Sequence, residues 1–205
     1  MSEGMQDPAD APSPAPLELE LKALADAGSF TAATTRAIEG YGGELLGYLC
    51  ALSPSNAEAE ELFSDLCERL WRALPQFRWT SSFRTWAYAI ARNLARDRHR
   101  KRKRANEVAL DQAPEIAELA IAVRTTTMMY MRTETKKRFD ELRAALDEDE
   151  RTLLVLRVDR RMPWRDIARV MADEGEDLDR LSASLRKRFE RVKDRLRAHL
   201  GAREP

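Results

Sequence analysis

Apolar side chains return every three or four positions along most of this chain, which is the spacing of one face of an α-helix. The segment between Ser55 and Pro75 shows this most clearly, and its apolar positions are Leu62, Phe63, Leu66, Leu70 and Trp71. No segment shows the strict alternation of apolar and polar residues that a half-buried strand requires. Glycine and proline, which interrupt helices, number only 8 and 9 among 205 residues. The sequence therefore predicts an all-α fold.

Prolines, glycines and capping residues divide the helical pattern into two small domains. Residues 1–16 hold several prolines between small and acidic residues, so we expect a disordered tail there. A first helical domain is expected over 17–104 and a linker over 105–135. The second helical domain, of helix-turn-helix type, is expected over 136–205.

Local signals predict where several helices begin and end. In the first domain, the pair Gly42–Gly43 should interrupt the helical pattern. A polar-aromatic loop over 76–82 is followed by a helix over 83–100. In the second domain we expect a short helix over 164–172, an acidic turn, and a longer basic helix over 181–200.

The charges are strongly segregated although the formal net charge is zero. Residues 1–76 carry thirteen acids and four bases, whereas residues 77–104 carry ten bases and one acid. An acidic block beside a concentrated basic block indicates two surfaces with different partners, and the basic surface suggests a phosphate backbone. The alternative is a solvated helix face, which ten bases interleaved with aromatic residues make less favourable.

The residues form no arrangement typical of an active site. The sequence has no phosphate-binding glycine loop, no Ser/His/Asp arrangement and no HExxH motif. Cys50 and Cys67 fall on apolar helix stripes, which favours buried free thiols over a metal or redox site. We therefore expect a binding protein rather than an enzyme, with no catalytic residue, no metal and no cofactor. The N-terminus lacks the features of a signal peptide, and no apolar run is long enough to span a membrane, so we expect a cytoplasmic protein without membrane insertion.

The basic segment combines arginines and aromatic residues in a pattern that suits nucleic acid. On a helical projection of the segment after the loop, Arg92, Arg96 and Arg100 lie one turn apart, opposite the apolar stripe. They are expected to form a solvent-exposed ridge that can contact phosphates. Trp79 has no periodic reason to be buried and could stack on an unpaired base. Trp86 lies on the apolar stripe, which favours a core position.

The last two expected helices have the order of a helix-turn-helix, in which the second helix enters the major groove. Leu185, Phe189, Val192 and Leu196 recur at helical spacing and should pack inward, leaving basic side chains outside. Many amphipathic helix pairs show a similar pattern. A solvated pair without a role in DNA binding is therefore the alternative.

Three segments point to a known family. Residues 58–71 read EAEELFSDLCERLW, and residues 81–86 read SSFRTW and are followed by IARN and an aspartate. With residues 183–197, these segments resemble the polymerase-binding helix (close to DAEDLVQEVFLRLW), the promoter-melting segment and the recognition helix (typically GTVKSRLHRARERLR) of the extracytoplasmic-function subfamily of bacterial sigma factors. The resemblance covers about 30–104 and 136–199.

The resemblance implies core RNA polymerase and promoter DNA as partners, with an anti-sigma factor as a further candidate. The residues implied in polymerase binding are Glu58, Glu61, Leu62, Asp65, Arg69 and Trp71. Those implied in binding the minus-ten element are Trp79, Thr80, Ser81, Ser82, Arg84, Trp86, Arg92, Asn93, Arg96 and Arg100. Those implied in binding the minus-thirty-five element are Ser184, Arg186, Lys187, Arg188 and Arg191.

Two features depart from the family pattern. About seven extra residues, acidic ones among them, lie between Ala172 and Ala183, so the two last helices could be splayed apart. Trp79-Thr80 stands where Gly-Glu is usual, so a promoter base preference does not carry over. The rival functions are a stand-alone helix-turn-helix regulator and a polymerase-interacting regulator that does not read promoters.

Overall fold

The computed structural model describes residues 16–101, 114–130 and 146–201. This part of the chain contains helices and no strand, as predicted. The helices are α1 (Pro16–Asp26), α2 (Phe30–Leu52), α3 (Asn56–Ala73), a short 3-10 helix (Leu74–Gln76), α4 (Phe83–Lys101), α5 (Pro114–Tyr130), α7 (Glu148–Leu154), a π-helical turn (Val155–Asp159), α8 (Trp164–Met171) and α9 (Leu178–Gly201). Of the tail expected over 1–16, residues 1–15 fall outside the described residues, and Pro16 is already the first residue of α1.

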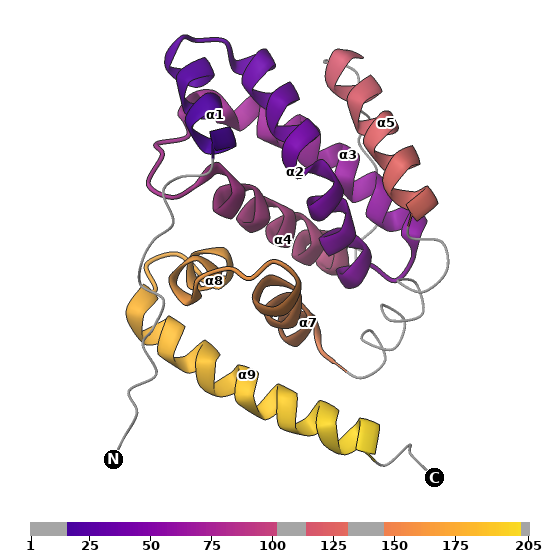
Figure 1. Ribbon diagram of the computed structural model, residues 1–205, viewed down its shortest axis with the longest axis vertical. Coiled ribbons are helices and arrows are strands. Elements are labelled where there is room, and N and C mark those ends of the chain that lie inside the picture. Colours follow the sequence, from indigo (N-terminus) through magenta and orange to yellow (C-terminus); the bar gives the residue numbers. More distant parts are fainter. Residues whose placement is uncertain (1–15, 102–113, 131–145, 202–205) are drawn as a thin grey trace.

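Helix α2 lies at the centre of the N-terminal helices and contacts α1, α3, α4 and α5 (Figure 1). It is continuous from Phe30 to Leu52, so the predicted interruption at Gly42–Gly43 is wrong. A Cβ at Gly42 would lie 3.0 Å from a methyl carbon of Val123 on α5. Burial of α2 against four neighbours offsets the low helix propensity of glycine, and Gly42 leaves room for α5 to pack closely.

Capping residues set the ends of α3 and the start of α4. The Ser55 hydroxyl accepts a hydrogen bond from the Glu58 amide, as an N-cap does, and Pro75 lies in the 3-10 turn that ends α3. Before α4, the Ser82 hydroxyl accepts from the Thr85 amide. These ends agree with the sequence expectation for both helices. They leave residues 77–82 as the connection between α3 and α4.

The C-terminal helices α7, α8 and α9 form a second packed unit. Helix α7 begins with a capping box in which Asp147 and Glu150 bond each other's backbone amides. Helix α9 starts at Leu178 rather than at 181, because the Asp177 carboxylate accepts from the Asp179 and Arg180 amides. The turn after α8 is therefore only residues 172–177, and the helix pair α8–α9 is in contact rather than splayed.

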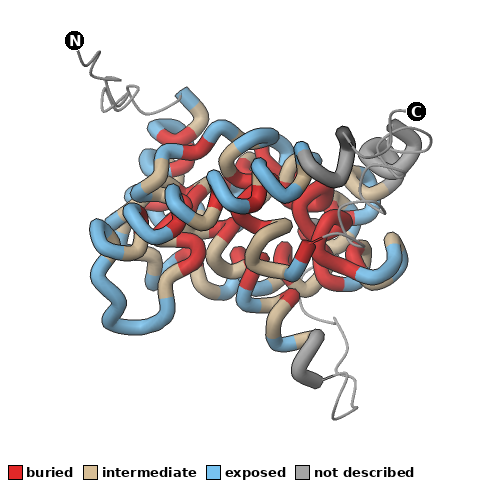
Figure 2. The backbone as a smooth tube through the Cα atoms, turned by 90° about the horizontal axis from the view of Figure 1, so that it is seen from below, coloured by how far each residue is buried: buried red, intermediate tan, exposed pale blue. Residues whose placement is uncertain are grey.

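The two units share an extensive contact. Helix α8 packs against α4, and α7 packs against α2 (Figure 1). Buried residues gather in the interior of the molecule (Figure 2), and one core cluster contains residues of both units, such as Leu49 of α2 and Leu153 of α7. Helix α5, which lies in the stretch expected to be a linker, packs on α2 and α3. Its buried residues Ile116 and Ala120 explain why this part of the span is an ordered helix.

Both cysteines are buried free thiols, as the apolar stripes predicted. Burial raises the pKa of the Cys67 thiol to about 12, which leaves it a poor nucleophile. Within the described ranges, no cluster of three or more His, Cys, Asp or Glu side chains could hold a metal ion. None of the helices there has the length and apolar character needed to cross a membrane.

Candidate polymerase and nucleic-acid interfaces

The predicted polymerase-binding residues lie along α3 and differ in exposure. Glu61 and Arg69 are exposed and Asp65 is partly exposed, while Leu62 is 2% exposed and packs in the core. Trp71 is partly buried, and its indole N–H donates to the Thr31 hydroxyl. A polar face of α3 is therefore presented to solvent. Leu62 supports this face from beneath instead of belonging to it.

Arg98 of α4 lies beside this acidic face. It forms an ion pair with Glu61, and its guanidinium lies 3.9 Å from the Asp65 carboxylate. Side chains at these positions retain substantial exposure, so the pairs are screened by solvent and contribute little to stability. A polymerase surface that binds the two acids would have to share them with Arg98 or displace it.

Two aromatic rings of the connection between α3 and α4, Phe77 and Trp79, cluster with Trp86 of α4. Phe77 stacks on Trp86 with ring centroids 4.4 Å apart, and Trp79 lies 4.9 Å from Phe77. Trp79 has a φ of 55°, a left-handed conformation that is uncommon for a bulky residue. The Lys22 ammonium lies 5.9 Å from the Trp79 ring centroid. Trp86 is partly buried, in line with its place on the apolar stripe.

The start of α4 is held by Glu18 of α1, a residue that the sequence analysis missed. Its carboxylate accepts hydrogen bonds from the Phe83 amide (2.7 Å) and the Arg84 amide (3.0 Å). The Tyr41 hydroxyl donates to the same carboxylate at 2.8 Å. An anion at a helix N-terminus satisfies otherwise orphaned amides and the positive end of the dipole. The sequence signal was the spacing of Glu18 with Leu21 and Ala25, which places an acid on the buried stripe of α1.

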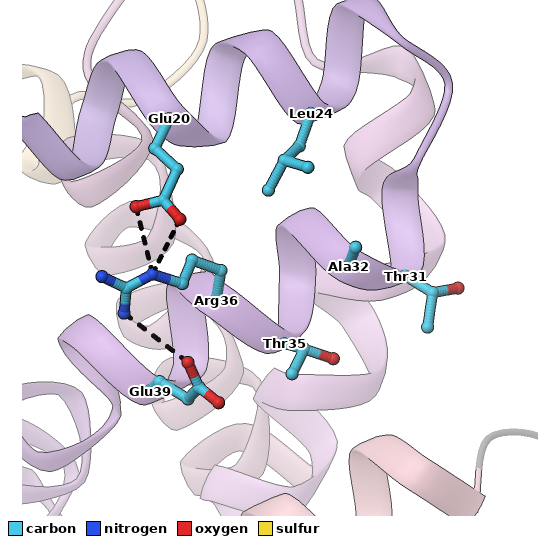
Figure 3. A pocket seen from close by; sticks show the side chains of 7 residues that line it. All are labelled: Glu20, Leu24, Thr31, Ala32, Thr35, Arg36 and Glu39. Atoms are coloured by element: carbon cyan, nitrogen blue, oxygen red, sulfur yellow. Dashed lines mark hydrogen bonds and ion pairs between the residues drawn. The ribbon is translucent and has the colours of Figure 1, made fainter.

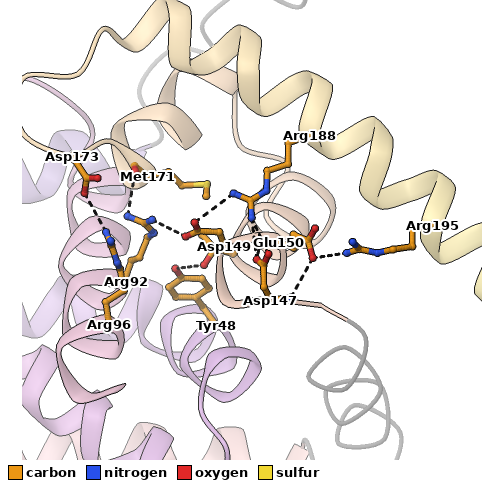
Figure 4. A network of polar contacts seen from close by, with 11 residues as sticks. Tyr48, Arg92, Arg96, Asp147, Asp149, Glu150, Met171, Asp173, Arg188 and Arg195 are labelled. Atoms are coloured by element: carbon orange, nitrogen blue, oxygen red, sulfur yellow. Dashed lines mark hydrogen bonds and ion pairs between the residues drawn. The ribbon is translucent and has the colours of Figure 1, made fainter. Parts of the chain in front are cut away.

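The arginine ridge on α4 is not the exposed feature that was predicted. Arg92 is 4% exposed and donates to the Asp149 carboxylate (2.8 Å) and the Met171 carbonyl (3.2 Å), as Figure 4 shows. Arg96 forms an ion pair with Asp173 at 3.2 Å. The projection identified the correct helix face, but α8 covers that face in the folded chain. The side chain of Arg100 lies outside the described residues, and Asn93 is exposed.

The two guanidinium groups around Asp149 keep its carboxylate ionised. Burial alone would raise the pKa of Asp149, but the hydrogen bond and charge of Arg92, together with Arg188, lower it below its usual value. A lowered pKa means that the pair stabilises the fold throughout the neutral range. This contribution is lost only as the pH falls through the lowered pKa, which lies on the acid side of the usual aspartate pKa of 3.8.

Arg84 also has a partner within the fold. Its guanidinium forms two hydrogen bonds with the Glu44 carboxylate, at 2.6 and 2.8 Å. Burial opposes its charge, but the bond and charge of Glu44 raise its pKa above the usual value. In this conformation Arg84 joins α4 to α2, so contact with DNA would compete with Glu44. The nearby Ser81 and Ser82 are partly exposed, and Thr80 is exposed.

Helix α9 has the predicted amphipathic arrangement. Leu185, Phe189 and Val192 are buried and Leu196 is partly buried, as expected. The exposed side includes Ser184, Arg186, Lys187 and Arg191. Arg188 differs, because it binds Asp147 at 3.0 Å and Asp149 at 3.4 Å. Its predicted DNA contact would therefore require these intramolecular bonds to be exchanged.

An open pocket lies between α1 and α2 (Figure 3). Arg36 crosses it to bind Glu20 at 3.0 Å and Glu39 at 3.5 Å, and the remaining lining side chains are Leu24, Thr31, Ala32 and Thr35. The pocket's one guanidinium is paired with both of its carboxylates. Its lining contains no pairing of a nucleophile with a base that would suggest chemistry.

Comparison with known families gives one match within the N-terminal helices. Residues 37–105, which run from α2 through α4, match the family model described as sigma-70 region 2. This match covers α3, the connection 77–82 and α4 in one unit, and the matched family is one of non-enzymatic transcription factors. The comparison with curated proteins found no match for the chain.

Proposed function

We propose that the chain is a sigma factor of the extracytoplasmic-function subfamily, which binds core RNA polymerase and directs initiation at specific promoters. The observation that carries this proposal is the match of residues 37–105 to sigma-70 region 2, since it spans both a polar helix face and the aromatic connection. In this proposal α3 binds the polymerase and the connection 77–82 captures an unpaired base of the minus-ten element. Helix α9 then reads the minus-thirty-five element in duplex DNA.

The direct test is co-purification with core polymerase, followed by run-off transcription from a panel of promoters. A sigma factor is expected to bind core and to produce transcripts from a subset of the panel. Core binding without promoter-dependent transcripts would instead favour the regulator that does not read promoters. The ion pairs that occupy Arg92 and Arg96 are the observation in favour of that second candidate. DNA binding that needs no polymerase would favour the stand-alone regulator.

Reversal of the two acids on α3, Glu61→Lys with Asp65→Lys, is expected to weaken core polymerase binding by about tenfold or more, because like charges at an interface are strongly unfavourable. The measurement is a titration of labelled protein with core enzyme. The matched control reverses two exposed acids on α1 and α2, Asp26→Lys with Glu39→Lys, and should keep the original affinity. Circular dichroism should show unchanged helicity in both variants. Equal affinities in all three proteins would contradict the assignment of α3.

The exposed bases near the start of α9 are expected to determine the upstream element. A guanine contact by Arg or Lys contributes about 1–3 kcal/mol of discrimination. Arg186→Ala with Lys187→Ala should therefore change which upstream sequence the polymerase prefers, measured as run-off product from matched and scrambled elements. The control Arg197→Ala removes an exposed base from the other end of α9. If matched and scrambled elements lose activity equally, α9 does not read base edges.

A further inference from the structure

The C-terminal unit covers the face of α4 that carries the arginines of the proposed DNA interface. Helix α8 packs on α4, and this contact leaves Arg92 only 4% exposed. Figure 4 shows Asp149 and Asp173 reaching Arg92 and Arg96 from the C-terminal unit. The arginine face is therefore occupied before any nucleic acid is present.

The carboxylates that occupy this arginine face bind guanidinium groups in the same way as the DNA phosphates that they would exclude. A guanidinium binds phosphate oxygens through charge-assisted hydrogen bonds, and it binds carboxylate oxygens in the same way. Arg92 meets the Asp149 carboxylate and the Met171 carbonyl, and Arg96 meets the Asp173 carboxylate. A phosphate could take the place of Asp149 at the buried Arg92 only if the C-terminal unit moved away.

Other contacts show that this arrangement is a specific interface. The Tyr48 and Thr152 hydroxyls are 3.2 Å apart and buried, and they join α2 to α7. The Arg160 guanidinium donates to the Glu44 carbonyl at 3.1 Å. Because these bonds link residues more than a hundred positions apart, they fix the orientation of the two units.

The same contact can open without leaving an isolated charge. Asp149 has a second guanidinium partner in Arg188 of α9, at 3.4 Å, which stays with it when Arg92 departs. Asp173 is 79% exposed, so its carboxylate is largely solvated in either state. Removal of one partner of a buried ion pair is costly chiefly when the other charge is left unpaired. When the two units separate, Arg92 loses its ion pair with Asp149 and gains an interaction with a DNA phosphate.

We propose that the chain has a self-masked state, in which Asp149 and Asp173 of the C-terminal unit occupy Arg92 and Arg96 and exclude DNA until the two units separate. The inference rests on the proposed function, because it assigns the arginine face of α4 to phosphate contacts. It adds that the isolated protein binds DNA weakly because its own C-terminal unit covers the arginine face of α4. Separation of the units would then couple to binding of DNA.

The test compares the wild type with the double variant Asp149→Asn, Asp173→Asn in the full-length chain without polymerase. The variant should show a larger radius of gyration by small-angle scattering. It should also bind a labelled promoter-length duplex with about tenfold higher affinity, measured by fluorescence anisotropy, because two ion pairs that compete with phosphate are removed. The single variant Asp173→Asn, which alters only an exposed turn residue, should move both readouts in the same direction.

The control Asp179→Asn, Asp194→Asn makes the same charge change on exposed residues whose partners, Arg165 and Arg197, lie within the C-terminal unit. It should remain compact and gain little affinity. Equal gains in the control and the test variant would overturn the inference, as would an unchanged radius of gyration in the test variant. Opening without a gain in DNA affinity would also overturn the masking. The proposed function would fail on a different observation, namely that the wild-type protein does not co-purify with core polymerase.

Discussion

Truncation of Phe83 to alanine is expected to lower the free energy of unfolding by about 4 kcal/mol, because it empties a large buried site. The Phe83 ring is fully buried, stacks on Tyr41 at 6.3 Å, and meets Trp86 edge to face at 5.4 Å. These neighbours belong to different helices, so their collapse into the cavity would be limited. Urea denaturation followed by far-ultraviolet circular dichroism measures the change.

The same experiment has a clear control in Leu19→Ala on α1. Leu19 is 56% exposed, so its truncation should change stability by less than about 0.5 kcal/mol. A loss below about 1 kcal/mol for Phe83→Ala would contradict the close packing at the start of α4. Because Phe83 lies directly after residues 77–82, its truncation should also weaken transcription from every promoter alike.

Replacement of Glu18 by alanine is expected to lower the free energy of unfolding by about 3 kcal/mol, because three buried or partly buried donors lose their common acceptor. These donors are the Phe83 and Arg84 amides and the Tyr41 hydroxyl. Urea denaturation again provides the measurement. Glu18→Gln keeps the shape and a neutral acceptor, so it should lose less stability than Glu18→Ala.

A matched control for this change is Glu20→Ala on the same helix. Glu20 forms a surface ion pair with Arg36, with both side chains more than two-fifths exposed, and its loss should cost less than about 1 kcal/mol. Equal losses for the two alanine variants would show that the carboxylate of Glu18 does not hold the start of α4. Since α1 lies outside residues 37–105, the result would also show whether α1 supports the connection 77–82.

The contact that masks α4 should respond differently to pH and to ionic strength. Asp149 contacts Arg92 and Arg188 at once, so it links the proposed minus-ten surface to the proposed recognition helix. Its lowered pKa makes this link insensitive to pH in the neutral range. Ionic strength is the more effective variable, because Arg96 and Asp173 are exposed enough to be screened.

Sequence alone determined the helical class and most helix boundaries. The reason is that apolar spacing and capping residues act over a few neighbouring positions. Ser55 and Pro75 delimit α3 because their effects on backbone amides are local. The inward stripe of α9, with Leu185 and Phe189, was likewise predictable from periodicity. Gly42 was misjudged because the close approach of Val123, far along the chain, decides its role.

The tertiary structure alone decided which charged side chains are free to contact solvent or DNA and which are covered by other helices. A helical projection places Arg92 and Arg96 on a polar face, but it contains no information about another helix that covers this face. Asp149 and Asp173 reach these arginines from more than fifty residues away, and Glu18 reaches the start of α4 from the other end of the first unit. Local periodicity determines the face on which a charge lies. Whether that face meets solvent, DNA or another part of the same chain depends on long-range packing, which becomes visible only when the helices are assembled.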